Sequence, residues 1–387
     1  MSETVTPTGA SSAPARATAL AGVLRDGAFW ADWAAAVGLV VLVVIFQAAN
    51  PTFLSSGNVR SMLVASAILV VLSVGQTFFV VTGGIDLSVA SVMTFGAVLF
   101  GFGITHGWGI VACGVLAVLG GGLIGVVNGV LVGNGRITDF VVTLGSLSAA
   151  SGLALVIADG KPVTVVNVAL LRLSTGGVGI IGWSVLVAAV VAVLAHLVLF
   201  RTRWGTHVFA AGGSAEAATA TGISVPLLKL STGGVGIIGW SVLVAAVVAV
   251  LSHVVLFRTR WGTHVFAAGG SPEAATATGI SVPAIKIAVY TVCGVLAGLA
   301  AILLVARVGA AEPAANTSFL LNSVAAVVLG GVSLVGGRGS VLGPVLGALL
   351  LTALANGLTL LGVSPFYQPV AVGTVVVLAA LLTRFRK

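Results

Sequence analysis

The amino-acid sequence predicts an all-α membrane protein, a polytopic bundle of about ten transmembrane helices plus one duplicated apolar segment. Two observations carry this prediction. Of the 387 residues, 58% are hydrophobic and only 7% are charged, and the mean hydropathy is +1.22; soluble domains carry about a quarter charged residues. The chain also contains 53 glycines, which suit transmembrane helices because small residues let helix backbones approach closely.

A bilayer core requires about 20 mainly apolar residues per helix, and the charge-free tracts divide on that scale. The transmembrane domain is expected to cover residues 34–383. Its predicted spans are residues 34–49, 61–82, 88–105, 108–132, 139–158, 179–200, 236–257, 284–306, 320–335, 341–361 and 368–383.

The two ends of the chain are predicted to be cytoplasmic tails. Residues 1–33 are rich in Ser, Thr and Ala, and no apolar h-region precedes the first span. We therefore expect an N-terminal tail and not a cleaved signal peptide. Residues 384–387 are expected to form a short basic C-terminal tail.

The net charge of +8 does not indicate nucleic acid, because the Lys and Arg residues stand singly between long apolar tracts. Such residues are topology signals. The two cysteines, Cys113 and Cys293, lie far apart inside apolar tracts. We expect them to be buried packing residues, and we expect no metal site and no cofactor.

Three sets of glycines are spaced four residues apart, which places each set on one helix face. They are Gly121, Gly125 and Gly129; Gly294 and Gly298; and Gly343 and Gly347. Glycine has no side chain with which to recognise a substrate, so these faces are predicted to serve close helix packing.

A tandem repeat has to be resolved before the topology can be assigned. Residues 170–226 recur as 227–283 and differ at four of the 57 positions, so 53 are identical. Solenoid repeats usually diverge and need several copies. This pattern instead indicates a recent duplication or, alternatively, merged variants of one gene.

Counting one copy of the repeat gives ten spans that agree with the positive-inside rule. With the N-terminal tail inside, Arg136, Arg201 with Arg203, Arg338 and the C-terminal basic cluster all become cytoplasmic. An eleventh span would reverse the membrane orientation of every segment after it. We therefore expect one apolar copy, residues 235–257 or its twin, to be re-entrant, interfacial or poorly packed instead of spanning normally.

The most specific motif is a glycine-broken link that carries a single acid, GGIDLS at residues 83–88. An acid at membrane depth usually faces a cavity, a partner or polar backbone. Irregular backbone is tolerated there only where it lines protein or water. Asp86 is a candidate either for capping the following helix or for contact with the substrate or gate. Gly83, Gly84 and Ser88 belong to the same candidate site.

A second glycine link, VLGGVSLVGGRGS at residues 328–340, lies between two late spans. Its resemblance to the first link suggests an old internal symmetry of the kind that many transporters retain.

Three segments together resemble the permease family of ribose, xylose and galactose ABC importers, and they occur in that family's order. They are GGIDLSVAS (83–91), RTRWGTHVFAAGGSPEAATATGISV (258–282) and VVLGGVSLVGGRGSVLGPVLGALL (327–350). The likeness extends over residues 35–383. Ala90 stands where the family usually has Gly, Ser214 and Ser271 stand where it often has Asn, and the duplication is foreign to it.

The resemblance implies a permease of about ten helices in the bacterial cytoplasmic membrane. It implies that the permease pairs with a second permease copy, identical or different, and that a cytoplasmic ABC ATPase subunit drives it. It also implies that an extracytoplasmic sugar-binding protein delivers the sugar. A ribose-, xylose- or galactose-like monosaccharide is the expected substrate, with a signalling furanose, a sugar alcohol or another polyol as alternatives.

The resemblance also implies a loop that couples the permease to the ATPase, and here the loop occurs twice. Each copy contains a short Ala-rich segment that is expected to form a helix ending in Gly, which suits a groove in a partner protein. The alternative is an amphipathic connector held at the surface. The candidate coupling residues are Arg201, Gly205, Glu216 and Gly222 in the first copy and Arg258, Gly262, Glu273 and Gly279 in the second.

Polar residues within the spans are candidates for the substrate pathway, because neutral hydrogen-bonding groups suit a sugar. They are Gln76, Asn128, Thr143, Asn322 and Asn356. For each of them, the alternative is a hydrogen bond between helices.

The sequence contains no GxxxxGK[ST] phosphate loop and no HExxH or GxSxG motif, so an enzyme is not expected. The alternative function is a self-sufficient secondary transporter, which normally carries several ionisable groups within its spans. Asp86 is the main candidate for such a group here. A membrane-embedded enzyme would need a cluster of acids, His or metal ligands that the sequence does not show.

Overall fold

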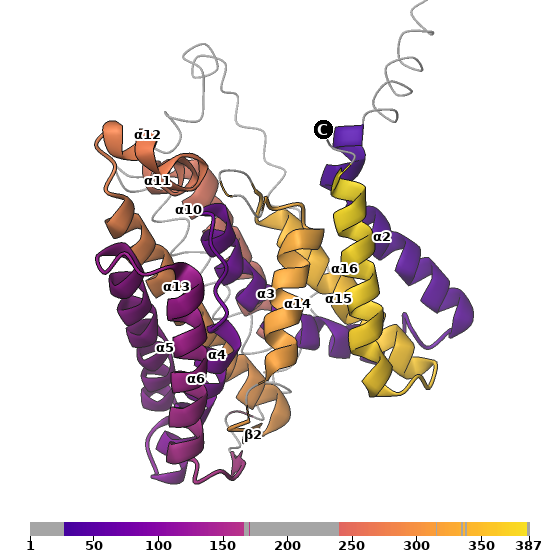
Figure 1. Ribbon diagram of the computed structural model, residues 1–387. Coiled ribbons are helices and arrows are strands. Elements are labelled where there is room, and N and C mark those ends of the chain that lie inside the picture. Colours follow the sequence, from indigo (N-terminus) through magenta and orange to yellow (C-terminus); the bar gives the residue numbers. More distant parts are fainter. Residues whose placement is uncertain are drawn as a thin grey trace, which may run out of the picture.

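The computed structural model describes residues 27–165, 170, 240–314, 316–333, 336 and 339–384. Most of these residues form helices that pack side by side (Figure 1). The helices are α2 (Gly27–Ala49), α3 (Ser56–Val81), α4 (Val89–Thr105), α5 (Ile110–Gly133), α6 (Asp139–Ile157), α10 (Trp240–Arg258), α11 (Arg260–Gly270), α12 (Pro272–Ala277), α13 (Val282–Val308), α14 (Thr317–Leu329), α15 (Leu342–Leu360), η3 (Pro365–Tyr367) and α16 (Gln368–Arg384). Two short strands, β1 (Val163–Thr164) and β2 (Ala310–Ala311), pair antiparallel with Val163 opposite Ala311.

The helices confirm most of the apolar segments predicted from the sequence. Five of them, α3, α5, α6, α13 and α15, are long and apolar enough to cross a membrane. The largest difference is in α14, which ends at Leu329 although the predicted span continued to residue 335. The reason is the pair Gly330 and Gly331, of which Gly331 has a φ of +74° that a helix cannot contain. The predicted span 179–200 lies outside the described residues.

Helix α3 forms the centre of the bundle. Its residues from Ser66 to Val81 are all buried, and it packs against α10, α13, α14 and α15. Helix α5 lies at the outside and keeps Val111, Leu119 and Leu123 more than 60% exposed. A soluble protein rarely exposes such a continuous apolar face, so this surface fits a protein embedded in lipid.

The predicted glycine face of α5 is confirmed as a close packing seam with α13. A Cβ added at Gly121 would lie 2.3 Å from the carbonyl oxygen of Gly294, and one added at Gly125 would lie 2.4 Å from that of Tyr290. At Gly298, an added Cβ would lie 2.6 Å from the carbonyl oxygen of Ala117. The two backbones therefore touch along the seam, and side chains other than hydrogen are excluded there.

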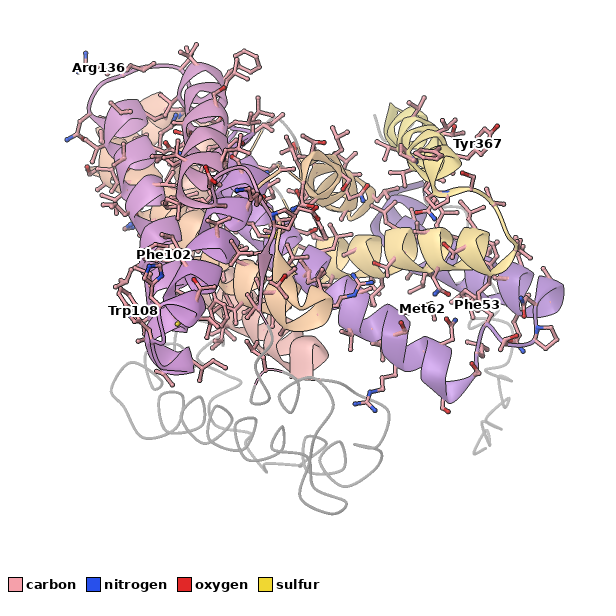
Figure 2. The ribbon with its side chains drawn as sticks, turned by 90° about the horizontal axis from the view of Figure 1, so that it is seen from below. Phe53, Met62, Phe102, Trp108, Arg136 and Tyr367 are labelled. Atoms are coloured by element: carbon pink, nitrogen blue, oxygen red, sulfur yellow. The ribbon has the colours of Figure 1, made fainter. Side chains whose placement is uncertain are left out.

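The two ends of the bundle carry different segments. Helices α11 and α12 and the C-terminal end of α16 lie at one end, and β2 lies at the other (Figure 1). Figure 2 shows Trp108 and Arg136 at opposite ends of α5. Capping residues fix the start of α13, since the Ser281 side chain accepts a bond from the backbone N–H of Ala284, and Gly309 with φ +75° ends it.

The second copy of the repeat contributes α10, α11 and α12 to the bundle. Residues 240–258 form α10, which packs against α3. The first copy lies outside the described residues apart from Leu170. The expectation that one of the two apolar copies does not span normally therefore stays a prediction.

Candidate functional site

The link between α3 and α4 holds the Asp86 carboxyl inside the bundle, where the residue is 4% exposed. Gly83 turns the chain after α3 with a φ of +80°. The Asp86 Oδ1 atom accepts hydrogen bonds from the backbone N–H and the Oγ of Ser88, at 2.7 and 2.6 Å. The Cys293 thiol of α13 donates to Oδ2 at 3.3 Å. Protein groups thus engage both carboxyl oxygens, and the Ser88 N–H that Asp86 binds belongs to the residue just before α4, so whether this acid caps the helix or contacts the substrate stays open.

A buried chain of polar groups extends from this link to α5 and α6. The Gln76 side chain of α3 donates to the Asp86 backbone carbonyl at 2.5 Å. Asn128 donates to Ser88 Oγ at 3.3 Å and accepts a hydrogen bond from Ser146 Oγ. The structure therefore brings together four predicted pathway residues, Gln76, Asp86, Ser88 and Asn128, around one link.

The remaining predicted pathway residues lie elsewhere. Asn356 of α15 exchanges two hydrogen bonds with Asn58 of α3, at 2.9 and 3.0 Å, which is the helix-to-helix alternative. Thr143 bonds to the Asp139 carbonyl of its own helix at 2.9 Å. Asn322 is half-buried on α14.

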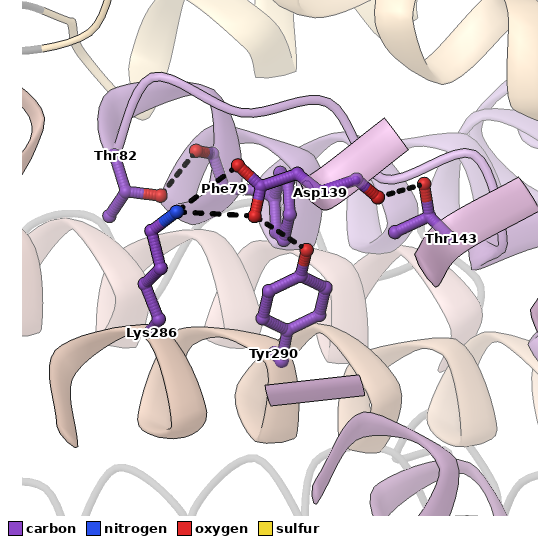
Figure 3. Close-up of polar contacts among 6 residues, drawn as sticks. All are labelled: Phe79, Thr82, Asp139, Thr143, Lys286 and Tyr290. Atoms are coloured by element: carbon purple, nitrogen blue, oxygen red, sulfur yellow. Dashed lines mark hydrogen bonds and ion pairs between the residues drawn. The ribbon is translucent and has the colours of Figure 1, made fainter. Parts of the chain in front are cut away.

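An ion pair that the sequence analysis missed lies beside the link (Figure 3). The Lys286 Nζ atom lies 3.2 and 3.3 Å from the two carboxyl oxygens of Asp139, and the Tyr290 hydroxyl donates to Asp139 Oδ1 at 2.9 Å. The Tyr290 ring packs edge-on against Phe79, with centroids 4.4 Å apart. This group therefore ties the start of α6 and the first turns of α13 to the last turn of α3.

One sequence signal could have pointed to this group. Lys286 and Tyr290 are four residues apart and so share one face of a predicted helix, and each of Asp139 and Lys286 stands at the polar edge of an apolar tract. A distant acid and base at equivalent edges of two spans are reasonable partners, but only the fold shows that they meet.

The candidate coupling segment of the second copy, residues 258–282, contains two short helices with defined caps, α11 and α12. Thr259 caps α11 by accepting from the Gly262 backbone N–H at 3.2 Å, and Ser271 caps α12 by accepting from that of Ala274 at 3.2 Å. Gly279 has a φ of +82° and turns the chain toward α13. This confirms the predicted helical segment that ends in Gly.

Several coupling candidates cannot be placed beside these helices. Arg201, Gly205, Glu216 and Gly222 belong to the first copy and lie outside the described residues. Arg258 and Glu273 are placed along the backbone of α10 and α12, while their side chains lie outside what the structure describes.

The second glycine link lies against the first. Gly336 has a φ of +88°, and a Cβ added to it would lie 2.9 Å from the backbone nitrogen of Gly83. Two motifs that are about 250 residues apart in the sequence therefore meet at the end of the bundle that carries α11. Within the described part of the chain, no group of three or more His, Cys, Asp or Glu side chains could hold a metal ion.

Comparison with known proteins gives a family and a set of relatives. The model of the family described as branched-chain amino acid transport system / permease component matches residues 58–240 and 230–382. The two matches overlap inside the repeat, as expected if each copy can fill the same place in the family. The search of solved structures found no match.

The relatives match over nearly their whole length. The ribose import permease protein of Bacillus subtilis is 34% identical over 90% of this chain and 91% of its own. The xylose transport system permease protein of Haemophilus influenzae is 30% identical, over 91% of this chain and 95% of its own. The D-allose transport system permease protein of Escherichia coli is 29% identical over 92% of each chain.

Proposed function

Because this chain belongs to the branched-chain amino acid transport system / permease component family, we propose that it is the membrane-spanning subunit of an ABC importer for a monosaccharide. The observation that carries this proposal is the similarity, over about nine-tenths of the chain, to permeases named for ribose, xylose and allose. These relatives share an aldose substrate class, so a small aldose of five or six carbons is the substrate that the similarity supports.

The polar groups beside the first link are consistent with such a substrate. Gln76, Ser88 and Asn128 are neutral and can donate or accept hydrogen bonds, which suits a sugar hydroxyl better than an ion. Asp86 is the acid that lies among them, and Ser88 and Cys293 already hold its carboxyl. A secondary transporter that couples to protons or sodium would be expected to present several such acids.

The proposed topology has ten spans with both termini in the cytoplasm of a bacterial cell. The α11 end of the bundle holds the connection from α5 to α6, the start of α13 and the end of α16 (Figure 1). These segments carry Arg136, Lys286 and Arg384, and the positive-inside rule favours the cytoplasm for such basic residues. In this orientation, both glycine links and the coupling segment face the cytoplasm.

The proposed partners are an ABC ATPase, an extracytoplasmic sugar-binding protein and a second permease copy. The sequence has no phosphate-binding loop, so a separate ABC ATPase must hydrolyse the ATP, and we propose that α11 and α12 face it. We also propose an extracytoplasmic sugar-binding protein at the opposite end and a second permease copy beside this one. Transport then proceeds by alternating access, with the helices around the two links opening or closing the pathway.

Reconstitution in proteoliposomes tests this function. The chain would be combined with an ABC ATPase and a sugar-binding protein from the same organism, and uptake of labelled ribose, xylose and allose would be measured. We expect uptake of one of them that needs ATP and stops when the ATPase is omitted. Uptake that continues without any ATPase would contradict the proposal and support the secondary transporter.

A further inference from the structure

Helix α11 of the second repeat copy is attached to the end of α3 at two points. At its start, the Trp261 ring packs on Phe78 with centroids 5.9 Å apart. At its other end, a Cβ added to Gly269 would lie 1.9 Å from the backbone oxygen of Val81 and 2.9 Å from the Cα of Thr82. Because real Cβ atoms essentially never approach within 3.0 Å, the backbone of α11 rests directly on the last turn of α3.

The second glycine link completes this contact. A Cβ added to Gly336 would lie 2.7 Å from the Gly269 carbonyl oxygen and 2.9 Å from the Gly83 backbone nitrogen. Three segments, namely α11, the first link and the second link, therefore meet backbone to backbone at Gly83, Gly269 and Gly336. We call these three residues the glycine junction.

The glycine junction leaves no side chain between α11 and either link. Side chains can change rotamer and absorb a displacement, whereas directly packed backbones cannot. A shift of α11 must therefore move both links. The first link carries Asp86 only three residues after Gly83, so that shift also reaches the buried polar chain through Ser88 and Asn128.

We propose that α11 of the second copy, held against α3 at Gly269, controls the position of both glycine links. The equivalent segment of the first copy does not control their position. The inference rests on the proposed function and deepens it. It identifies which of two nearly identical coupling segments works and the positioning residue through which it works.

The duplication supplies an unusually close control for the test. Gly269 and Gly212 occupy equivalent positions in the identical sequence RTRWGTHVFAAGGS of the two copies. In the full chain reconstituted with its ATPase and binding protein, we expect Gly269→Ala to lower the sugar imported per ATP hydrolysed by about tenfold, because the methyl group pushes α11 off α3. Gly212→Ala should leave this ratio unchanged.

The amount of sugar imported per ATP hydrolysed distinguishes a misplaced α11 from a protein that is only less stable. A variant that only folded less well would lower ATP hydrolysis and uptake together, in proportion to the protein present. If Gly269→Ala imports sugar with the normal ratio, or if Gly212→Ala shows the same loss, the inference is wrong. If the unmodified chain shows no ATP-dependent uptake, the proposed function itself fails, and this result is distinguishable from the other two.

A second measurement does not depend on activity. Cysteines placed by Phe78→Cys and Trp261→Cys should be joined by a short bifunctional thiol reagent, since the two rings are in contact. The control pair is Phe78→Cys with Trp204→Cys, the equivalent tryptophan of the first copy. Cross-linking of the first pair supports the inference, and preferential cross-linking of the control pair overturns it.

Discussion

Replacing Gly125 by leucine is expected to prevent the folded protein from accumulating in the membrane. Even one added carbon at Gly125 would lie 2.4 Å from the Tyr290 carbonyl oxygen and 3.0 Å from the Thr291 Cα, both of which belong to the backbone of α13. Overpacking of a core costs about 1–3 kcal/mol and occasionally more. Here the added side chain would meet backbone atoms, which cannot change rotamer. We therefore expect a loss of stability at or above the upper end of that range.

The measurement is the yield of monodisperse protein after extraction in detergent, together with its thermal midpoint. Gly145→Leu is the matched control, since Gly145 lies on the apolar helix α6 and has nothing within 4 Å of an added Cβ. We expect the control to resemble the unmodified protein. A Gly125→Leu protein with normal yield and thermal midpoint would show that α5 and α13 are not in backbone contact.

Replacing Asp86 by alanine is expected to abolish sugar uptake while leaving membrane insertion intact. The change leaves the buried N–H and hydroxyl of Ser88 and the thiol of Cys293 without their acceptor. Each buried group left without a partner costs about 1–3 kcal/mol. That is enough to disorder the first link, whereas the helices themselves keep their packing.

Uptake per amount of inserted protein is the measurement for this variant. Asp159→Ala is the control, because Asp159 is 88% exposed in a pair with Lys161 at the other end of the bundle. We expect the control to transport normally. Asp86→Asn should fall between the two, since its amide oxygen can still accept from Ser88 while its amide nitrogen cannot accept from Cys293. Normal transport by Asp86→Ala would rule out an essential role for the carboxyl.

Much of the helical structure could be predicted from the sequence because hydropathy depends on composition alone. The predicted span 139–158 and the helix Asp139–Ile157 nearly coincide, and so do 368–383 and Gln368–Arg384. Hydropathy did not predict the end of α14, because backbone conformation determines where that helix ends. After Leu329 the chain stays apolar, yet the paired glycines end the helix.

The site was only partly predictable, because its groups come from segments far apart in the chain. The acid in GGIDLS and the four-residue glycine spacing are local signals; the packing role of the glycines is confirmed, whereas the role of the acid stays a prediction. The Asp139–Lys286 pair spans 147 residues, and no local pattern relates the two side chains. Likewise, the spacing showed that Gly121 lies on a packing face but not that its partner is Gly294.

The two copies of the repeat could not be told apart from the sequence. The two copies share 53 of 57 residues, so propensity and hydropathy treat them alike. Of the two copies, the structure describes the second, whose α10 and α11 pack on α3 and whose last residues begin α13. This placement is the basis on which we propose the second copy as the working coupling segment.

We expect one copy of the repeat to suffice for a sugar-importing permease. Deleting residues 227–283 joins the first copy directly to Ala284 and leaves 330 residues, and the product differs from the alternative deletion of 170–226 at only four positions. Sugar uptake by this 330-residue protein, reconstituted with its ATPase and binding protein, is the most direct test. We predict ATP-dependent uptake at least as fast as that of the full chain; a protein that inserts normally but imports no sugar would show that the second copy is needed for transport.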